Sequence, residues 1–216
     1  MNLPASTPPR QGRKASINRE DIIQAALTLV GPNRQLSTLS LREVAREAGI
    51  APNSFYRHFR DMDELAVALI DLAGRSLREI IGQARQRATQ EGSVVRSSIE
   101  SFMEQLGADQ KLLHILLREG SVGSDAFKDA VERELSYFEE ELREELIRLT
   151  TASGNQLMHP ALTSRAITRL VFAVGASTMD LPPEQWGQVR EELIVMVRMI
   201  LAGSNALARQ PGAGVR

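Results

Sequence analysis

Residues 125–150 carry the pattern that most constrains the fold of this chain. Apolar side chains recur there at spacings of 4, 3, 4, 4 and 3 residues, at Val131, Leu135, Phe138, Leu142, Leu146 and Leu149. That spacing gives an α-helix one continuous apolar face. Other segments repeat it, and none shows the strict alternation of apolar and polar residues that is typical of a strand. The sequence therefore predicts an all-α protein of about nine helices.

The charge of the chain is unevenly distributed. Residues 1–60 contain nine Arg and Lys but only four Asp and Glu, although the net charge of all 216 residues is −1. A basic N-terminal quarter on an acidic body is typical of a nucleic-acid-facing module attached to a part that need not contact phosphate. Chance clustering of solvated charges is the alternative.

Several function classes lack support. The chain has no cysteine, which excludes disulfides and thiolate sites. Its start has no apolar signal core and its longest apolar run is too short to span a bilayer, so we expect a cytoplasmic protein with no membrane role. His58, His114 and His159 are far apart, and no phosphate-binding loop or nucleophile motif occurs. We therefore expect no catalytic residues, metal or cofactor, and an enzyme remains an alternative only if scattered residues assemble its site.

A helix-turn-helix is predicted over residues 41–59. Ser40-Leu41-Arg42-Glu43 is a capping box that starts a helix over 41–48, and Gly49-Ile50 forms the turn. Pro52 can begin a second helix over 52–59. Ala45 and Gly49 are four residues apart, which we expect to let the two helices approach closely.

The second helix divides into two faces. Phe55 and Phe59 are four residues apart and are expected to face the core. The polar side chains then lie on the other sides, where the first turns of a recognition helix meet base edges and phosphates in the major groove. The candidate DNA-binding residues are Arg42, Pro52, Asn53, Ser54, Tyr56, Arg57, His58 and Arg60.

The segment SLREVAREAGIAPNSFYRHFRDMDEL, residues 40–65, resembles the DNA-binding segment of TetR-family transcriptional regulators. The resemblance implies four regions: a flexible basic arm (1–16), a helix-turn-helix DNA-binding domain (17–62), an effector-binding and dimerisation domain (63–207) and a flexible tail (208–216). It also implies a homodimer that pairs through its last two helices and binds a palindromic double-stranded operator.

More narrowly, LSLREVAREAGIAP and SFYRHFRD, with ARQR, GSV and LLRE downstream, are similar to the FabR/DesT-type repressors of unsaturated fatty acid synthesis and desaturase genes. This similarity implies a repressor of lipid metabolism genes that responds to acyl-CoA or acyl carrier protein thioesters. A TetR-type regulator of another pathway, such as efflux, with a different hydrophobic effector is the alternative. A helical enzyme or interaction domain with no DNA role is the alternative from another class.

One departure from the wider family concerns a phosphate contact. Many members have a lysine at the start of the fourth helix, where this chain has Met62. Arg60 and the backbone N–H groups of that helix could replace this contact. The arm residues Arg10, Arg13 and Lys14 could reach the minor groove or remain solvated.

The effector pocket is expected among the apolar residues of the larger domain. With only nine aromatic residues in the chain, the composition favours an aliphatic ligand. The candidate pocket residues are Phe102, Met103, Leu106, Leu113, Leu116, Phe127, Leu135, Phe138 and Phe172. For the polar end of the ligand, Arg118 and Glu119 are possible contacts, with a surface ion pair as the alternative.

Overall fold

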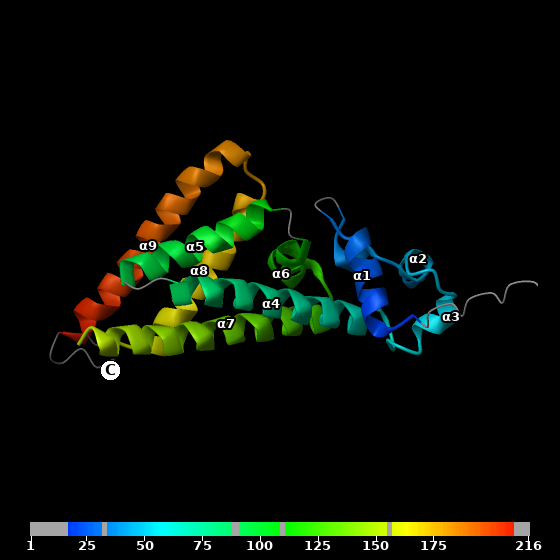
Figure 1. The fold of residues 1–216 in the computed structure, drawn as a ribbon, viewed down its shortest axis with the longest axis horizontal. Coiled ribbons are helices and arrows are strands. Elements are labelled where there is room, and N and C mark those ends of the chain that lie inside the picture. The colour runs from blue at the N-terminus through cyan, green and yellow to red at the C-terminus, as the bar shows by residue number, and fades with distance from the viewer. Residues whose placement is uncertain (1–16, 32–33, 88–90, 109–110, 155–156, 210–216) are drawn as a thin grey trace, which may run out of the picture.

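The computed structural model describes residues 17–31, 34–87, 91–108, 111–154 and 157–209 (Figure 1). These residues form nine α-helices and two short 3-10 turns and contain no β-strand, so the all-α prediction is confirmed for them. The first group is α1 (Arg19–Leu29), the turn η1 (Leu36–Thr38), α2 (Leu41–Glu47) and α3 (Pro52–Phe55). The second group is α4 (Met62–Arg87), α5 (Glu91–Gly107), α6 (Lys111–Val122), α7 (Asp125–Ala152), α8 (Pro160–Thr178), the turn η2 (Pro183–Gln185) and α9 (Trp186–Ala208).

The helix α4 connects the two groups. Figure 1 shows it running from the small N-terminal helices into the larger body, where it lies beside α7. Its buried residues recur every three or four positions, at Leu65, Ala66, Leu69, Ile70, Ala73, Gly74, Leu77, Ile81 and Ala84. The buried apolar side chains of the described residues form one cluster that extends from Ile22 in α1 to Leu201 in α9. One helix therefore contributes to the core at both ends of the molecule.

Charged side chains fix α4 against α7. The carboxylate of Glu134 is 2% exposed and forms an ion pair with Arg78. Burial raises the pKa of Glu134 above its ordinary value, although the neighbouring Arg78 acts in the opposite direction. Gly74 leaves room for this carboxylate, because a Cβ atom at Gly74 would lie 1.8 Å from Oε2 of Glu134. The contact therefore requires glycine on the facing side of α4.

Some predicted segments lie outside the described residues. They include the arm 1–16, with Arg10, Arg13 and Lys14, and most of the tail. The helix α4 ends at Arg87, and residues 88–90 are not described. The domain boundaries stay predictions. Among the residues that the structure describes, no helix has the length and apolar character needed to cross a membrane.

Candidate nucleic-acid interface

The start of α2 is fixed by the predicted capping box. Ser40 N donates to Glu43 Oε2 at 3.0 Å, and Glu43 N donates back to Ser40 Oγ at 3.4 Å. Arg34, before η1, forms an ion pair with the same carboxylate. The hydrogen bond from the Ser40 hydroxyl, followed by that from Arg34, lowers the pKa of Glu43 to about 2. Glu43 is thus held ionised at the entrance to the helix-turn-helix.

The turn after α2 depends on the backbone of Gly49. Its φ is +69°, which side-chain-bearing residues rarely adopt. Ile50 N donates to Ala45 O at 2.9 Å and Gly49 N to Arg46 O at 3.1 Å, which is a Schellman cap. The predicted close approach of the helices at Gly49 is wrong, because a Cβ atom there would meet nothing within 4 Å. Glycine is needed here for its conformation and not for space.

The helix α3 is shorter than predicted but keeps the predicted core face. It ends at Phe55 rather than at residue 59, and the chain continues as a tighter turn in which His58 N donates to Phe55 O at 2.9 Å. Phe59 N also donates to Phe55 O, at 3.1 Å, so both rings remain on the same side. They are fully buried with centroids 5.6 Å apart, and the guanidinium of Arg19 lies 4.4 Å from the centre of the Phe59 ring. Tertiary packing therefore holds a helix too short to be stable alone.

The opposite side of α3 faces solvent. Tyr56 is 60% exposed and its ring meets that of Phe55 edge-on. The other candidates separate into two groups. Those that are exposed are Arg42, Pro52, Asn53, Arg57 and Arg60, and those that are half-buried are Ser54 and His58. Only Pro52, Asn53 and Ser54 lie within α3 itself, and the other candidates lie on α2 or in the turn that follows α3.

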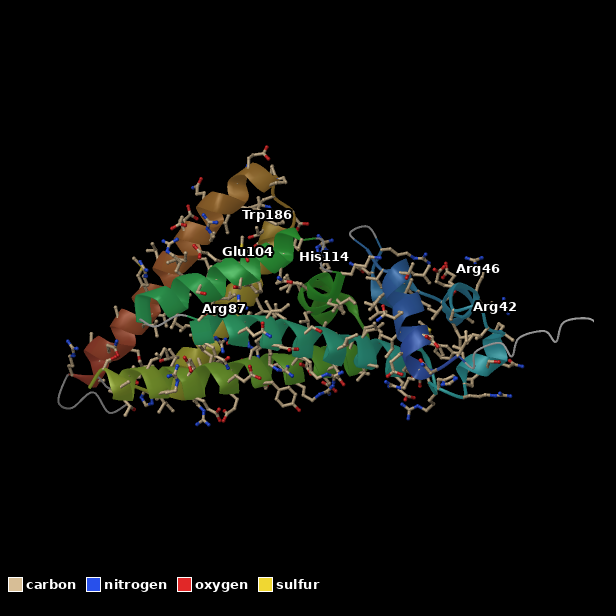
Figure 2. All side chains as sticks on the ribbon, viewed as in Figure 1. Arg42, Arg46, Arg87, Glu104, His114 and Trp186 are labelled. Carbon is tan, nitrogen blue, oxygen red and sulfur yellow. The ribbon has the colours of Figure 1, made fainter. Side chains whose placement is uncertain are left out.

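Arg46 was missed by the sequence prediction. It is exposed on α2, four residues after Arg42, so the two arginines lie on one helix face. Figure 2 shows both at the end of the molecule that is formed by α2 and α3. The four-residue spacing was visible in the sequence and could have identified Arg46.

The start of α4 is already occupied by carboxylates. Asp61 Oδ1 accepts a hydrogen bond from Glu64 N at 2.8 Å, and Glu64 Oε2 accepts one from Arg60 N at 2.7 Å. The hydrogen bond from Glu64 N, more than the Arg60 side chain, lowers the pKa of Asp61. The Arg60 side chain is 81% exposed and lies 3.1 Å from Asp61. The exposed guanidinium of Arg60 therefore remains able to contact phosphate. The backbone N–H of Glu64 does not, because it already donates to Asp61.

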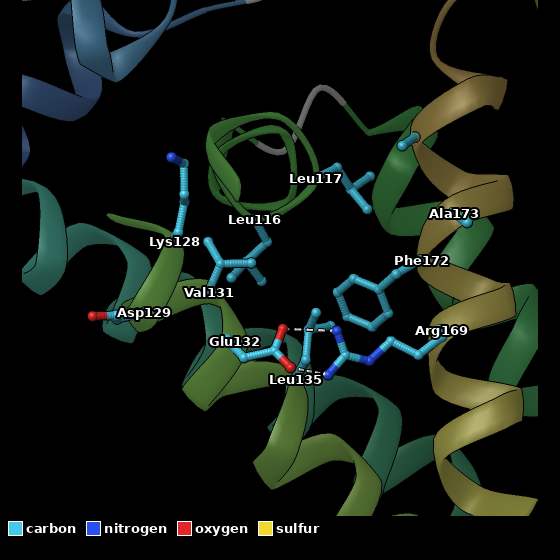
Figure 3. Close-up of a pocket in the computed structure, with 11 residues that line it drawn as sticks. Leu116, Leu117, Lys128, Asp129, Val131, Glu132, Leu135, Arg169, Phe172 and Ala173 are labelled. Carbon is cyan, nitrogen blue, oxygen red and sulfur yellow. Dashed lines mark hydrogen bonds and ion pairs between the residues drawn. The ribbon is translucent and has the colours of Figure 1, made fainter. Parts of the chain in front are cut away.

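A cleft of about 470 Å³ lies in the larger body between α6, α7 and α8 (Figure 3). Three of the predicted pocket residues, Leu116, Leu135 and Phe172, line its apolar part. Glu132 and Arg169 face each other across it, with Arg169 Nη1 donating to Glu132 Oε2 at 2.7 Å. This hydrogen bond lowers the pKa of Glu132 below its ordinary value. The cleft is apolar inside and charged along its edge.

The remaining pocket candidates lie deeper. Phe102 and Phe138 pack on Phe172, with centroid distances of 5.7 and 5.1 Å, and all three line a smaller cavity of about 50 Å³. Met103, Leu106, Leu113 and Phe127 are buried in the core and line neither space. Arg118, a proposed head-group contact, lies 2.9 Å from Asp180. The side chain of Glu119 is outside the described residues. Within the described part of the chain, no cluster of three or more His or acidic residues could hold a metal ion.

Solved structures share this fold. A transcriptional regulator from Rhodococcus sp. Rha1 aligns with a TM-score of 0.70 and 16% identity over 88% of this chain and 98% of its own. A TetR-family regulator from Agrobacterium tumefaciens aligns with a TM-score of 0.66 and 15% identity over 82% and 96%. The fatty acid degradation regulator FadR from Bacillus halodurans aligns with a TM-score of 0.63 and 18% identity over 81% and 97%.

The N-terminal part of the chain carries the family signal. Residues 22–69, from α1 through the first turns of α4, match the family model described as bacterial regulatory proteins, tetR family. The matched range includes the whole helix-turn-helix, with the Phe55 and Phe59 anchor and the exposed Tyr56 and Arg57. Residues 22–69 are therefore similar to the N-terminal part of tetR-family bacterial regulatory proteins.

Proposed function

We propose that this protein is a repressor that binds a palindromic operator as a homodimer, and that fatty acyl thioesters of CoA or acyl carrier protein change its affinity for that operator. The observation that supports the DNA-binding part of the proposal is the division of residues 52–59 into a buried side and an exposed side. Phe55 and Phe59 are fully buried, whereas Tyr56 is 60% exposed beside exposed Asn53 and Arg57. A rigidly anchored helix with polar groups on its outer side is the arrangement that a double-stranded DNA reader needs.

The exposed side chains have complementary roles in this proposal. The planar guanidinium of Arg57 can donate two hydrogen bonds to guanine or to a phosphate. Asn53 and Ser54 can both donate and accept hydrogen bonds at base edges, and the Tyr56 hydroxyl can reach phosphate. Arg42 and Arg46 on α2 supply positive charge toward the backbone. His58 is half-buried, so packing and a backbone contact remain its two possible roles.

The outer faces of α8 and α9 support pairing with a second copy of the chain. Leu162 on α8 is 63% exposed, and Val195 and Met199 on α9 are 49% and 67% exposed. Val195 and Met199 are four residues apart and share a helix face, while Ile194 and Val197 of the same helix are buried. Exposed apolar side chains grouped in this way are typical of a protein interface. A dimer of this kind would have to place its two recognition helices about 34 Å apart to match one turn of DNA.

The cleft between α6, α7 and α8 supports a hydrophobic effector. Its volume of about 470 Å³ lies within the range of ligand sites, and its interior is mainly aliphatic. The similar structure of FadR from Bacillus halodurans is that of a fatty acid degradation regulator by description, which is consistent with an acyl ligand here. An effector acts by binding two states of the dimer with different affinity. Because α4 reaches from this body to the helix-turn-helix, a shift of α4 would change the separation of the recognition helices.

Gel-shift titration with acyl ligands tests the effector part of the proposal. The operator is first selected from a random DNA library with the wild-type protein. The shift is then repeated with saturated and unsaturated acyl-CoA of equal chain length and with free CoA. We expect the acyl-CoA compounds to change the operator affinity and the two chains to differ, while free CoA has no effect. Identical titration curves under all conditions would remove the acyl-thioester proposal and leave the DNA-binding part standing.

A further inference from the structure

Arg85, near the end of α4, occupies an unusual position for a cation. Its side chain lines two apolar cavities, one of about 60 Å³ next to α9 and one of about 50 Å³ next to Phe172. Ser98, Ile99 and Leu142 line both cavities as well, so the two cavities share four lining residues, with Arg85 among them. Aliphatic and aromatic side chains make up most of the remaining walls.

No ion pair or hydrogen bond joins the Arg85 side chain to another residue in the described part of the chain. The nearest carboxylates are engaged elsewhere. Glu141 lies 3.1 Å from Arg78, and Glu145 accepts a hydrogen bond from Arg148 Nε at 2.9 Å. Burial lowers the pKa of Arg85 below its ordinary value, although Glu141 and Glu145 act in the opposite direction. Arg85 is half-buried, and Glu145 lines the cavity next to α9 together with it. A partly desolvated guanidinium that makes no hydrogen bond favours an acceptor that arrives with a ligand.

The shape of the cavities indicates what such a ligand must look like. A group with acceptor oxygens is needed at Arg85, and an aliphatic chain is needed along the walls. The two cavities hold only a short chain as they stand. Phe172 lines both the inner cavity and the open cleft, so a longer chain that displaces its ring would continue into the cleft.

We propose that Arg85 anchors the acyl oxygen of the ligand, either a carboxylate or a thioester carbonyl, with the aliphatic chain running from Arg85 past Ile99 and Leu142 toward Phe172. This inference rests on the proposed response to acyl compounds and assigns the site that recognises their polar end. It also accounts for a half-buried charge that lines two mainly apolar cavities.

Calorimetric titration with ligands of one chain length tests the assignment. Octanoate, octanoyl-CoA and 1-octanol share the eight-carbon chain, but 1-octanol has no carbonyl oxygen. Wild type is expected to bind at least one of the two acyl ligands about tenfold or more tighter than 1-octanol, since a hydrogen bond from a charged group has that effect on affinity. Whichever of octanoate and octanoyl-CoA binds more tightly identifies the form of the acyl group that the site takes.

Arg85→Met removes the guanidinium and keeps a similar apolar stem. This variant is expected to lose the preference for acyl ligands over 1-octanol and to unfold at the same or a higher temperature, because it removes a half-buried charge that makes no hydrogen bond. Arg85→Lys keeps a charge but not the planar fork and is expected to bind acyl ligands with intermediate affinity. Arg87→Met is the matched control, since Arg87 is exposed at the same end of α4 (Figure 2), and it should bind as wild type does.

Failure of the Arg85 assignment and failure of the proposed acyl response give different results in these titrations. If wild type prefers acyl ligands and Arg85→Met or Arg85→Lys keeps the full preference, the assignment of Arg85 is wrong and the acyl response stands. If wild type binds none of the acyl ligands better than 1-octanol, both the assignment and the proposed acyl response are overturned, whereas operator binding is unaffected.

Discussion

Lys111 Nζ donates a hydrogen bond to the backbone carbonyl oxygen of Leu27 at 2.9 Å, and a second one to Thr28 O at 3.0 Å. Lys111 is the first residue of α6, and the two carbonyl groups belong to the last turn of α1. The carbonyl end of a helix carries partial negative charge, so the ammonium group both satisfies these acceptors and is attracted to them. A helix that borders the cleft between α6, α7 and α8 is thereby tied to α1 among the N-terminal helices.

Replacing Lys111 with methionine should loosen this connection. We expect Lys111→Met to lower the free energy of unfolding by about 1 kcal/mol, because two carbonyl groups lose a charged donor. Urea denaturation of the two proteins measures the difference. Lys128→Met serves as the control, since Lys128 is exposed and pairs with Asp125, three residues away on the same helix. Equal losses in the two variants would mean that the contact to α1 has no particular effect on stability.

The two glycines Gly49 and Gly82 should respond oppositely to alanine. At Gly49, φ is +69°, so Gly49→Ala should destabilise the protein by about 1–2 kcal/mol. Gly82 lies inside α4 with nothing within 4 Å of an added Cβ atom, so Gly82→Ala should stabilise it by about 0.5–1 kcal/mol. Thermal unfolding of both variants checks the pair. Stabilisation by Gly49→Ala would contradict the conformational role of that residue.

The ionisation of Glu43 should make the stability of the folded protein depend on pH in the acidic range. Its pKa is about 2 in the folded protein against an ordinary value of 4.5, so its ionised form is favoured by folding. This contribution is complete above about pH 4.5 and is lost as the pH falls toward 2. We therefore expect the unfolding temperatures of wild type and Glu43→Gln to converge over that interval. A constant offset between wild type and Glu43→Gln over that interval would show that the Ser40 and Arg34 contacts do not stabilise the fold.

Local sequence patterns predicted the helices well because their causes are local. The Ser40–Glu43 capping box and the Phe55 and Phe59 spacing both involve neighbours within four residues, and both are present in the structure. The end of α3 could not be predicted in the same way. Its last turn tightens after Phe55, and the burial of the two rings, rather than helix propensity, holds the segment in place.

Contacts between distant parts of the chain account for what the sequence did not reveal. The isolation of Arg85 depends on Glu141 and Glu145 being paired with other arginines, which no local pattern indicates. The same holds for Lys111, whose acceptors are more than eighty residues away. Apolar residues such as Met103 and Phe127 were predicted to line the pocket from composition and helix face alone. The structure places them in the core, because an apolar side chain looks the same in sequence whether it faces a cavity or another helix.

Substitutions of exposed side chains within residues 52–59 should separate DNA binding from folding. Tyr56→Ala and Arg57→Ala remove exposed side chains, so both variants should lose specific operator binding and unfold as wild type does. Phe55→Ala removes a fully buried ring and should instead destabilise the protein by about 3–5 kcal/mol. Circular dichroism melting together with gel shifts distinguishes the two effects. Specific binding that survives both surface substitutions would mean that other residues read the operator.

Competition binding tests the central claim most directly. The wild-type protein is bound to a labelled palindromic operator selected from a random library, and unlabelled operator or a scrambled duplex of the same composition is added at fixed salt concentration, because salt controls non-specific affinity. We predict that the operator displaces the label at concentrations at least about a thousandfold lower than the scrambled duplex does. Equal displacement by the two duplexes would contradict the proposal that residues 52–59 read a specific DNA sequence.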